Sequence, residues 1–138
     1  MAFFQVDILT PNRALAKNVS ADSLELNTAM GQIGVLPHHE NLLANLAPGT
    51  LVLQEGEKKN YFFLSVGVIR VTEGKVTILS SVAEAASEIN LERSKKALEK
   101  SKDKLKDPLL TDGDSVKYKR KMERAEARIK AALLVGNS

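Results

Sequence analysis

The sequence predicts a mainly β protein with an α-helical second part: an N-terminal antiparallel β sandwich or barrel, followed by an antiparallel two-helix hairpin. Short alternating apolar segments separated by turn residues recur through about residue 85. From about Ala83 onward Val, Phe and Thr become rare, and the strong helix formers Ala, Glu, Lys and Leu dominate. We therefore expect a β domain over residues 1–86 and a helical hairpin over 87–138.

The expected strands follow one another without any segment long enough for a crossover helix. This spacing favours antiparallel pairing, because parallel neighbours need a connection of a dozen or more residues. Polar and glycine-containing turns such as Glu55–Asn60 and Thr72–Lys75 separate the segments. The expected strands are 3–8, 13–20, 22–27, 50–54, 61–65, 67–71 and 76–80.

The stretch from Gly31 to Leu43 is predicted to be a turn region between strands. Gly31 and Gly34 permit positive φ or close backbone approach, and Pro37 removes a hydrogen-bond donor. Adjacent histidines, His38 and His39, point in different directions in extended or turn backbone, so they cannot readily chelate one metal ion. We favour a turn histidine that bonds to the backbone.

Two helices are expected after the β domain. Ser87 is the expected N-cap of the first, and Asp107-Pro108 ends it, because the residue before proline disfavours the helical region. The second starts at about Ser115. Each helix has a thin apolar stripe, so the hairpin must lean on the β domain, a partner or a ligand. The stripes are Leu91, Leu98 and Leu105, and Tyr118, Met122, Ala125, Ile129 and Leu133.

Composition narrows the classes of function. The 138 residues contain no Cys and carry a net charge of +3. Residues 86–138 hold 14 Lys or Arg against nine Asp or Glu, an excess that suits an acidic partner. Acidic and basic residues are interleaved there and Tyr118 is the only aromatic residue, so a nucleic-acid-binding hairpin is the weaker alternative.

Catalytic signatures are missing from the sequence. There is no P-loop, no nucleophile elbow and no paired carboxylate arrangement, so we expect no enzymatic activity. No run approaches the roughly 20 apolar residues of a membrane helix. The N-terminus also lacks the basic and apolar regions of a secretory signal, which predicts a cytoplasmic location.

The motif G-x-[IL]-G-[IV]-[LY]-P-x-H-x-x-L-L, followed by P-G, resembles that of the epsilon-subunit family of bacterial F-type ATP synthases. It reads here from Gly31 to Leu43, with Pro48-Gly49 after it. The next family block, [FY]-[FILV]-x-[LV]-x-G-G-x-[ILV], matches Tyr61–Ile69, except that Val66 replaces the first glycine. The resemblance covers essentially the whole chain.

The resemblance implies a ten-stranded β sandwich followed by two helices, in a non-catalytic central-stalk subunit. Such a subunit binds the gamma subunit and the c ring of a proton- or sodium-translocating ATP synthase, at the cytoplasmic face of the bacterial plasma membrane. Its hairpin either folds on the sandwich or extends towards acidic loops of the alpha and beta subunits and inhibits ATP hydrolysis. Membrane association is then peripheral, through the complex, and nucleic acid is not a partner.

Two sets of site residues follow from the resemblance. Gln32, Gly34, His39 and Leu42 lie at the family's rotor contacts, although many relatives have Glu at the position of Gln32. No cofactor is required, but some relatives bind ATP as a regulatory ligand on the folded hairpin. The matching positions here are Glu84, Asn90, Arg93, Arg124 and Arg128, with Asn90 in place of the family's Asp.

Overall fold

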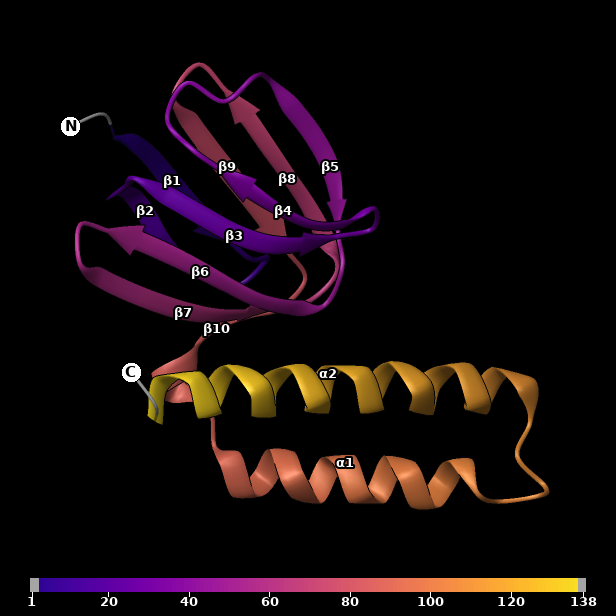
Figure 1. Ribbon diagram of the computed structural model, residues 1–138. Coiled ribbons are helices and arrows are strands. Elements are labelled where there is room, and N and C mark those ends of the chain that lie inside the picture. The colour runs from indigo at the N-terminus through magenta and orange to yellow at the C-terminus, as the bar shows by residue number, and fades with distance from the viewer. Residues whose placement is uncertain (1–2, 137–138) are drawn as a thin grey trace.

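A computed structural model describes residues 3–136 and contains ten strands, a short 3-10 helix and two α-helices (Figure 1). The strands occupy the N-terminal part of the chain and the helices follow them. The strands are β1 Phe4–Leu9, β2 Ala14–Ala21, β3 Ser23–Thr28, β4 Gly31–Val35, β5 Leu42–Leu46, β6 Gly49–Glu55, β7 Lys58–Leu64, β8 Gly67–Thr72, β9 Lys75–Ser80 and β10 Ala83–Ala85. The helices are η1 Ala86–Glu88, α1 Leu91–Leu105 and α2 Asp112–Gly136.

The strands form one continuous sheet folded into two layers, in the order β10-β7-β6-β3-β5-β8-β9-β1-β2, with β4 beside β3. Strand β3 joins the layers: it pairs with β4 and β6 in one layer and meets β5 of the other at Thr28 and Leu46. The antiparallel sandwich expected from the sequence is thus confirmed. The region from Gly31 to Leu43, expected to be a turn, instead contains β4 and the first residues of β5.

One strand pairing differs from the expectation. β1 and β9 run parallel, with Val6 opposite Val76 and Ile8 opposite Ile78. All other pairings among the described strands are antiparallel. Folding the sheet into two layers brings the first strand beside the ninth, so the whole intervening chain serves as the crossover that a parallel pair needs.

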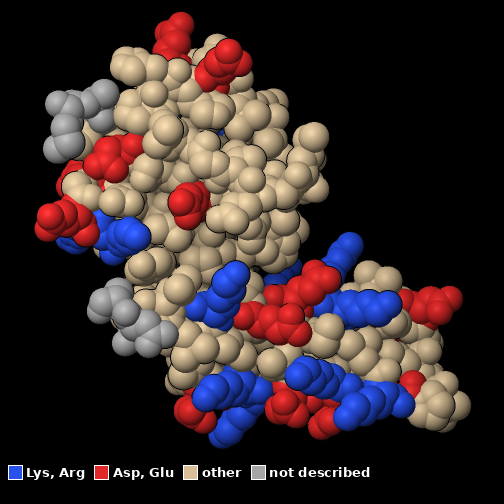
Figure 2. All heavy atoms as spheres, viewed as in Figure 1, with Lys and Arg blue, Asp and Glu red and all other residues tan. Residues whose placement is uncertain are grey.

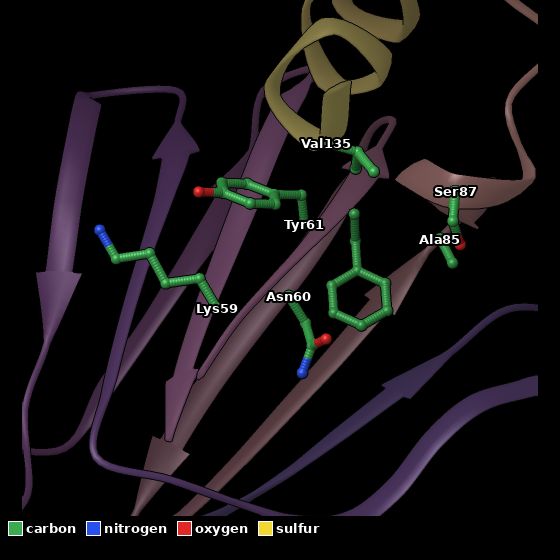
Figure 3. A pocket seen from close by; sticks show the side chains of 7 residues that line it. Lys59, Asn60, Tyr61, Ala85, Ser87 and Val135 are labelled. Atoms are coloured by element: carbon green, nitrogen blue, oxygen red, sulfur yellow. The ribbon is translucent and has the colours of Figure 1, made fainter. Parts of the chain in front are cut away.

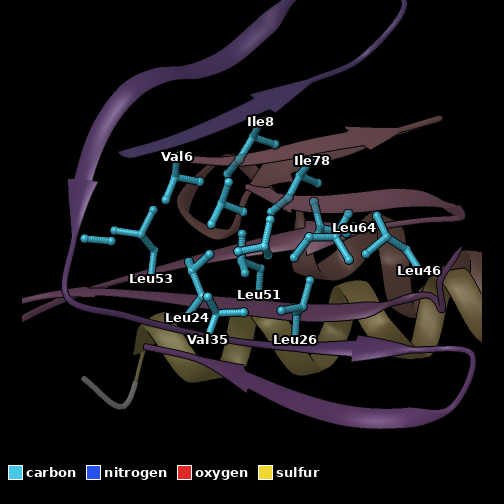
Figure 4. Packing of buried hydrophobic residues seen from close by; sticks show 14 of the residues in the cluster. Val6, Ile8, Leu24, Leu26, Val35, Leu46, Leu51, Leu53, Leu64 and Ile78 are labelled. Carbon is cyan, nitrogen blue, oxygen red and sulfur yellow. The ribbon is translucent and has the colours of Figure 1, made fainter. Parts of the chain in front are cut away.

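Inward-facing residues from both layers form the main core (Figure 4). In β1 the side chains of Val6 and Ile8 are fully buried, and in β6 those of Leu51 and Leu53 are. Each alternates with a more exposed neighbour, as expected for a strand with only one face in the core. The alternation read from the sequence therefore identifies the core positions of these strands.

The two α-helices begin at positions other than those expected. Ser87 lies within η1, and Asn90 is the N-cap of α1: its side-chain oxygen accepts a hydrogen bond from the Arg93 backbone N–H at 3.0 Å. Helix α2 begins at Asp112, three residues before the expected start. The Thr111 hydroxyl accepts from the Asp114 N–H at 3.2 Å and satisfies one of the unpaired donors of the first turn.

Helix α2 lies between the sandwich and α1 (Figure 1). One side of α2 contacts β6, β7 and η1, where buried Phe63 and Ala131 form the centre of a second apolar cluster. Where α2 ends over β7 and β10, Val135 and Tyr61 line a small crevice of about 150 Å³ (Figure 3). The hairpin is therefore docked on the sandwich in this structure.

The leucines of α1 are not the most buried residues of its inner face. Leu91, Leu98 and Leu105 are half-buried, whereas Ser94 and Ser101, which lie between them, are buried. Small side chains at the interface between two helices let their backbones approach closely, but they bury little apolar area. The weak hairpin interface expected from the sequence fits this arrangement.

A charged cluster fixes an irregularity in the β1–β2 pairing. The Asp7 carboxylate accepts hydrogen bonds from the Asn18 backbone N–H at 2.6 Å and from Lys75 Nζ at 2.9 Å. Asn18 has a φ of 52°, and the register between β1 and β2 shifts beside Asp7. The backbone bond from Asn18, followed by the bond from Lys75, lowers the pKa of Asp7 below its usual 3.8.

We expect Asp7→Asn to lower the free energy of unfolding at pH 7 by about 1.5–3 kcal/mol, the range for a hydrogen bond to a charged group. Because the folded-state pKa is depressed, this stabilisation is fully present above pH 3.8 and is lost as the pH falls through the folded-state value. Urea unfolding of both proteins at pH 7 and at several values below pH 3.8 measures the difference. If the difference in unfolding free energy between the wild type and Asp7→Asn stays constant down to the lowest pH, the stabilisation does not come from the ionised Asp7 carboxylate.

Candidate functional site

A pocket of about 300 Å³ lies where the end of the sandwich meets both helices. β10 contributes Glu84, the residues around the start of α1 contribute Asn90 and Arg93, and α2 contributes Arg128. The structure thus brings together four of the five residues expected for nucleotide binding. The remaining lining residues are Glu88, Ile89, Ser94 and Ala97.

Arg128 is held from two sides. Its Nε donates a hydrogen bond to Glu84 Oε1 at 2.8 Å, and both side chains are about 70% buried. The centre of its guanidinium group lies 4.9 Å from the centroid of the Phe63 ring, a cation–π distance. Arg128 therefore connects α2 to both β10 and β7, and its position is set before any ligand binds.

Asn90 has a structural role that its sequence position alone does not reveal. Its side chain caps α1, a role that Asp and Asn perform almost equally well. Replacing the family's Asp by Asn therefore keeps the start of the helix in place while removing one negative charge from the pocket. A neutral residue here reduces repulsion of an anionic ligand.

The charges around the pocket favour an anion. Arg93 and Arg128 line the pocket. At its edge Arg13, from the turn between β1 and β2, forms a salt bridge with Glu88, with Nη2 3.1 Å from Oε2. Three guanidinium groups thus face two carboxylates, those of Glu84 and Glu88. Arginine donates paired hydrogen bonds to phosphate oxygens, so a phosphate-bearing ligand suits this set.

Arg124 is the expected residue that the structure does not bring into the pocket. It lies on α2 one turn before Arg128 and is not among the lining residues. The four-residue spacing places both arginines on the same side of the helix, but the pocket reaches only the later turn.

The residues expected at rotor contacts lie on and after β4. Gln32 and Gly34 are exposed. The His39 backbone N–H donates to the Leu36 carbonyl at 3.1 Å, and His39 Nδ1 lies 2.6 Å from the Glu40 carbonyl oxygen. His39 therefore stabilises its own turn. The side chain of Leu42 is half-buried and packs against the main core, whereas its neighbour Leu43 is exposed.

A second exposed surface has no counterpart among the site residues expected from the sequence. Leu9, Leu79 and Val68 lie side by side across β1, β9 and β8, on the face that points away from the core. With Pro11 and Val66 they form what we call the outer apolar patch, around a shallow depression of about 450 Å³. Leu79 is 48% exposed and Val66 51%.

The sequence carried only a weak signal for this patch. Val68, Ile69 and Val71 are all apolar, so strand alternation does not separate the inner from the outer face of β8. The clearest sequence signal for this surface is Val66, an apolar residue where the family motif has glycine. No helix covers this layer of the sandwich in the described part of the chain, whereas α2 covers the other (Figure 1).

Metal-binding groups and membrane-spanning helices are both missing from the described residues. Within residues 3–136, no three His, Cys, Asp or Glu side chains are grouped so that they could hold a metal ion. No helix in the same range is long and apolar enough to span a membrane.

Comparisons with known proteins agree with this architecture. A family described as "ATP synthase, Delta/Epsilon chain, beta-sandwich domain" matches residues 3–86. The ATP synthase epsilon chain of Solibacter usitatus is 35% identical over 93% of this chain and 94% of its own length. The epsilon chain of an Anaeromyxobacter strain is 32% identical over 92% and 96%, respectively. Both alignments thus extend through the hairpin.

Solved structures show the same fold. A chain of the Euglena gracilis mitochondrial ATP synthase, in a structure of OSCP, F1 and the c ring, superposes with a TM-score of 0.83 at 26% identity. The superposition covers 100% of this chain and 83% of the Euglena chain. A chain from the central stalk and c ring of the Tetrahymena thermophila enzyme shares the fold, with a TM-score of 0.67 at 16% identity. The chain therefore belongs to the ATP synthase delta/epsilon family.

Proposed function

We propose that this chain is a central-stalk subunit of a proton- or sodium-translocating ATP synthase. It has no catalytic residues of its own, couples the rotor to the c ring and regulates ATP hydrolysis through its helices. The sandwich of residues 1–86 is the docking domain, and residues 87–138 are the regulatory domain. The chain attaches to the cytoplasmic face of the bacterial plasma membrane only through the complex.

The outer apolar patch is the observation that carries the docking role. It lies on the uncovered layer of the sandwich, with exposed Leu43 of β5 on the same layer. A contiguous apolar surface rimmed by polar residues is typical of a protein interface. The gamma subunit of the stalk is the occupant we propose, and the turn that contains His39 lies towards the c ring.

We expect Leu79→Asp to weaken binding to an ATP synthase stripped of this subunit by about 30-fold or more, because a charge would be buried in an apolar interface. Leu133→Asp is the matched control, since Leu133 of α2 is 47% exposed but lies away from the patch. Its affinity should change by less than about threefold. Titration of the stripped enzyme with labelled chain measures both. If the two variants lose affinity equally, or if neither loses affinity, the outer apolar patch is not part of the interface.

The regulatory role is supported by how the hairpin is attached. Only α2 and η1 contact the sandwich extensively, and α1 packs on α2. Lys and Arg alternate with Asp and Glu along the hairpin surface seen in Figure 2, with a basic excess over the whole segment. An extended hairpin would present this excess to acidic loops of the alpha and beta subunits. The interleaving gives no support to the alternative of nucleic-acid binding.

The pocket beside Arg128 is the site we propose for ATP as a regulatory ligand. Its volume and its arginines suit a nucleotide phosphate. In this structure the Glu84 carboxylate forms a salt bridge with the Arg128 guanidinium group. Phosphate oxygens would therefore compete with that carboxylate for the guanidinium group. ATP would then bridge β10, α1 and α2 and favour the docked hairpin.

We expect Arg93→Ala to weaken ATP binding at least about tenfold, because it removes a charged phosphate donor that lines the pocket. Arg124→Ala is the control with the same charge change, and its effect should stay within about threefold because Arg124 lies outside the lining. Isothermal titration calorimetry of ATP into both variants and the wild type decides. If ATP produces no binding heat with the wild type, ATP is not a ligand of this chain. If both variants lose affinity equally, ATP binds elsewhere on the hairpin.

A further inference from the structure

The turn between β1 and β2 brings Arg13 to the edge of the pocket that Glu88 lines. Thr10 fixes this turn: its backbone N–H donates to the Arg13 carbonyl at 2.9 Å, and its hydroxyl accepts from the Arg13 N–H at 3.1 Å. From there Arg13 Nη2 donates to the Ala83 carbonyl at 3.4 Å and to Glu88 Oε2 at 3.1 Å. One guanidinium group therefore connects the turn to both β10 and η1.

Each carboxylate in the pocket lining is already paired with an arginine. Glu84 pairs with Arg128 at 2.8 Å, and Glu88 pairs with Arg13 at 3.1 Å. The guanidinium group of Arg93, which also lines the pocket, has no ion pair or hydrogen bond with any side chain in residues 3–136. Arg93 is therefore the lining cation whose donors are available to a phosphate group.

Glu88 would compete with a phosphate ligand if Arg13 did not hold it. Glu88 and Arg93 line the same pocket of about 300 Å³, and opposite charges so confined attract each other. Arg128, the other lining cation, is already held from two sides. A released Glu88 carboxylate would therefore pair with Arg93, occupy its donors and add a negative charge that repels phosphate.

We propose that Arg13 is a positioning residue of the nucleotide pocket: it holds Glu88 at the edge and thereby keeps Arg93 available to phosphate. The inference rests on the proposed function, which makes ATP the ligand of this pocket. The side chains of Arg13 and Glu88 are 47% and 51% exposed, and ion pairs at such exposure contribute little to folding stability. The pair therefore acts through the position of the carboxylate, and Arg13 can be replaced without unfolding the sandwich.

Calorimetric titration of ATP into single and double variants tests this role. We expect Arg13→Gln to bind ATP about fivefold more weakly than the wild type. Adding Glu88→Gln to that variant should restore the affinity to within about twofold of Glu88→Gln alone, because no carboxylate then competes for Arg93. The double variant still lacks the bond from Arg13 to Ala83, so recovery excludes a purely structural effect. Arg70→Gln is the matched control, since exposed Arg70 of β8 does not line the pocket, and its affinity should stay within about twofold of the wild type.

NMR of the ligand-free chain provides the second measurement. The side-chain Nε–H signal of Arg93 should shift in Arg13→Gln, where Glu88 pairs with it, and return to its position in Glu88→Gln when both substitutions are combined. If Arg13→Gln binds ATP as tightly as the wild type, or if the double variant stays as weak as Arg13→Gln, Arg13 does not act through Glu88 and the inference is overturned. If the wild type binds no ATP, the proposed ligand is wrong. The Arg93 signal then decides separately, because an unchanged signal in Arg13→Gln overturns the positioning role.

Discussion

Replacing Phe63 by alanine is expected to release the helical hairpin and to lower the free energy of unfolding by about 3–5 kcal/mol. Phe63 is fully buried, yet it faces α2 rather than the main core, in a cluster with Ala86 and Ala131. Its ring also supports the guanidinium group of Arg128. The substitution therefore removes both a fully buried aromatic side chain that packs against α2 and the cation–π partner of Arg128.

Hydrogen exchange can separate this effect from general unfolding. Amides of α1 and α2 should lose protection in Phe63→Ala, while those of β1 and β8, which pack in the main core, keep theirs. Phe3→Ala is the control, because Phe3 is exposed and should change stability by less than about 0.5 kcal/mol. Uniform loss of protection across the strands would show that Phe63 supports the sandwich and not the hairpin.

Gly67→Ala is expected to destabilise the sandwich by about 3 kcal/mol or more. A Cβ on Gly67 would overlap the Leu79 carbonyl oxygen and lie 2.9 Å from the Cα of Ser80. Both obstacles are backbone atoms of β9, which is hydrogen-bonded to β8 and cannot move without breaking that pairing. Gly67 does not have a positive φ, so the demand for glycine comes from the close approach of β9.

Gly113→Ala is the matched control for this change. Gly113 lies in the first turn of α2, and a methyl group there would have open space around it, with no contact from the described residues within 4 Å. Alanine should therefore stabilise the chain by about 0.5–1 kcal/mol. Thermal or urea unfolding of both variants measures the contrast. If Gly67→Ala unfolds at the wild-type midpoint, the backbone of β9 can move enough to accommodate the methyl group, and the prediction is wrong.

The strands could be predicted from the sequence because one physical pattern governs them. Val6 and Ile8 alternate with exposed residues, and burial of one face of β1 requires that alternation. The pattern fails where both faces of a strand are covered. Phe62 packs towards the main core and Phe63 towards α2, so the two adjacent aromatic residues give no sign of which faces which.

The candidate site was predictable in part. Glu84, Arg93 and Arg128 were identified through a family motif, and they meet in one pocket. Motif spacing cannot show where a pocket ends along a helix, so the resemblance also implies Arg124, which lies one turn outside the pocket lining. The parallel pairing of β1 with β9 could not be predicted either, because it depends on how the whole sheet closes and not on any local pattern.

The anchoring of the hairpin by the second half of α2 has a consequence for the order of events during synthesis. A chain emerges from the ribosome in the N-to-C direction, and domains fold as units. All ten described strands precede α1, and the main packing surface of α1 is α2. The residues that seat α2 on the sandwich, Ala127 and Ala131, come after every other element has emerged. Docking of both helices is thus the final step, and a released chain that ends before Ala127 would have a finished sandwich with an unattached α1.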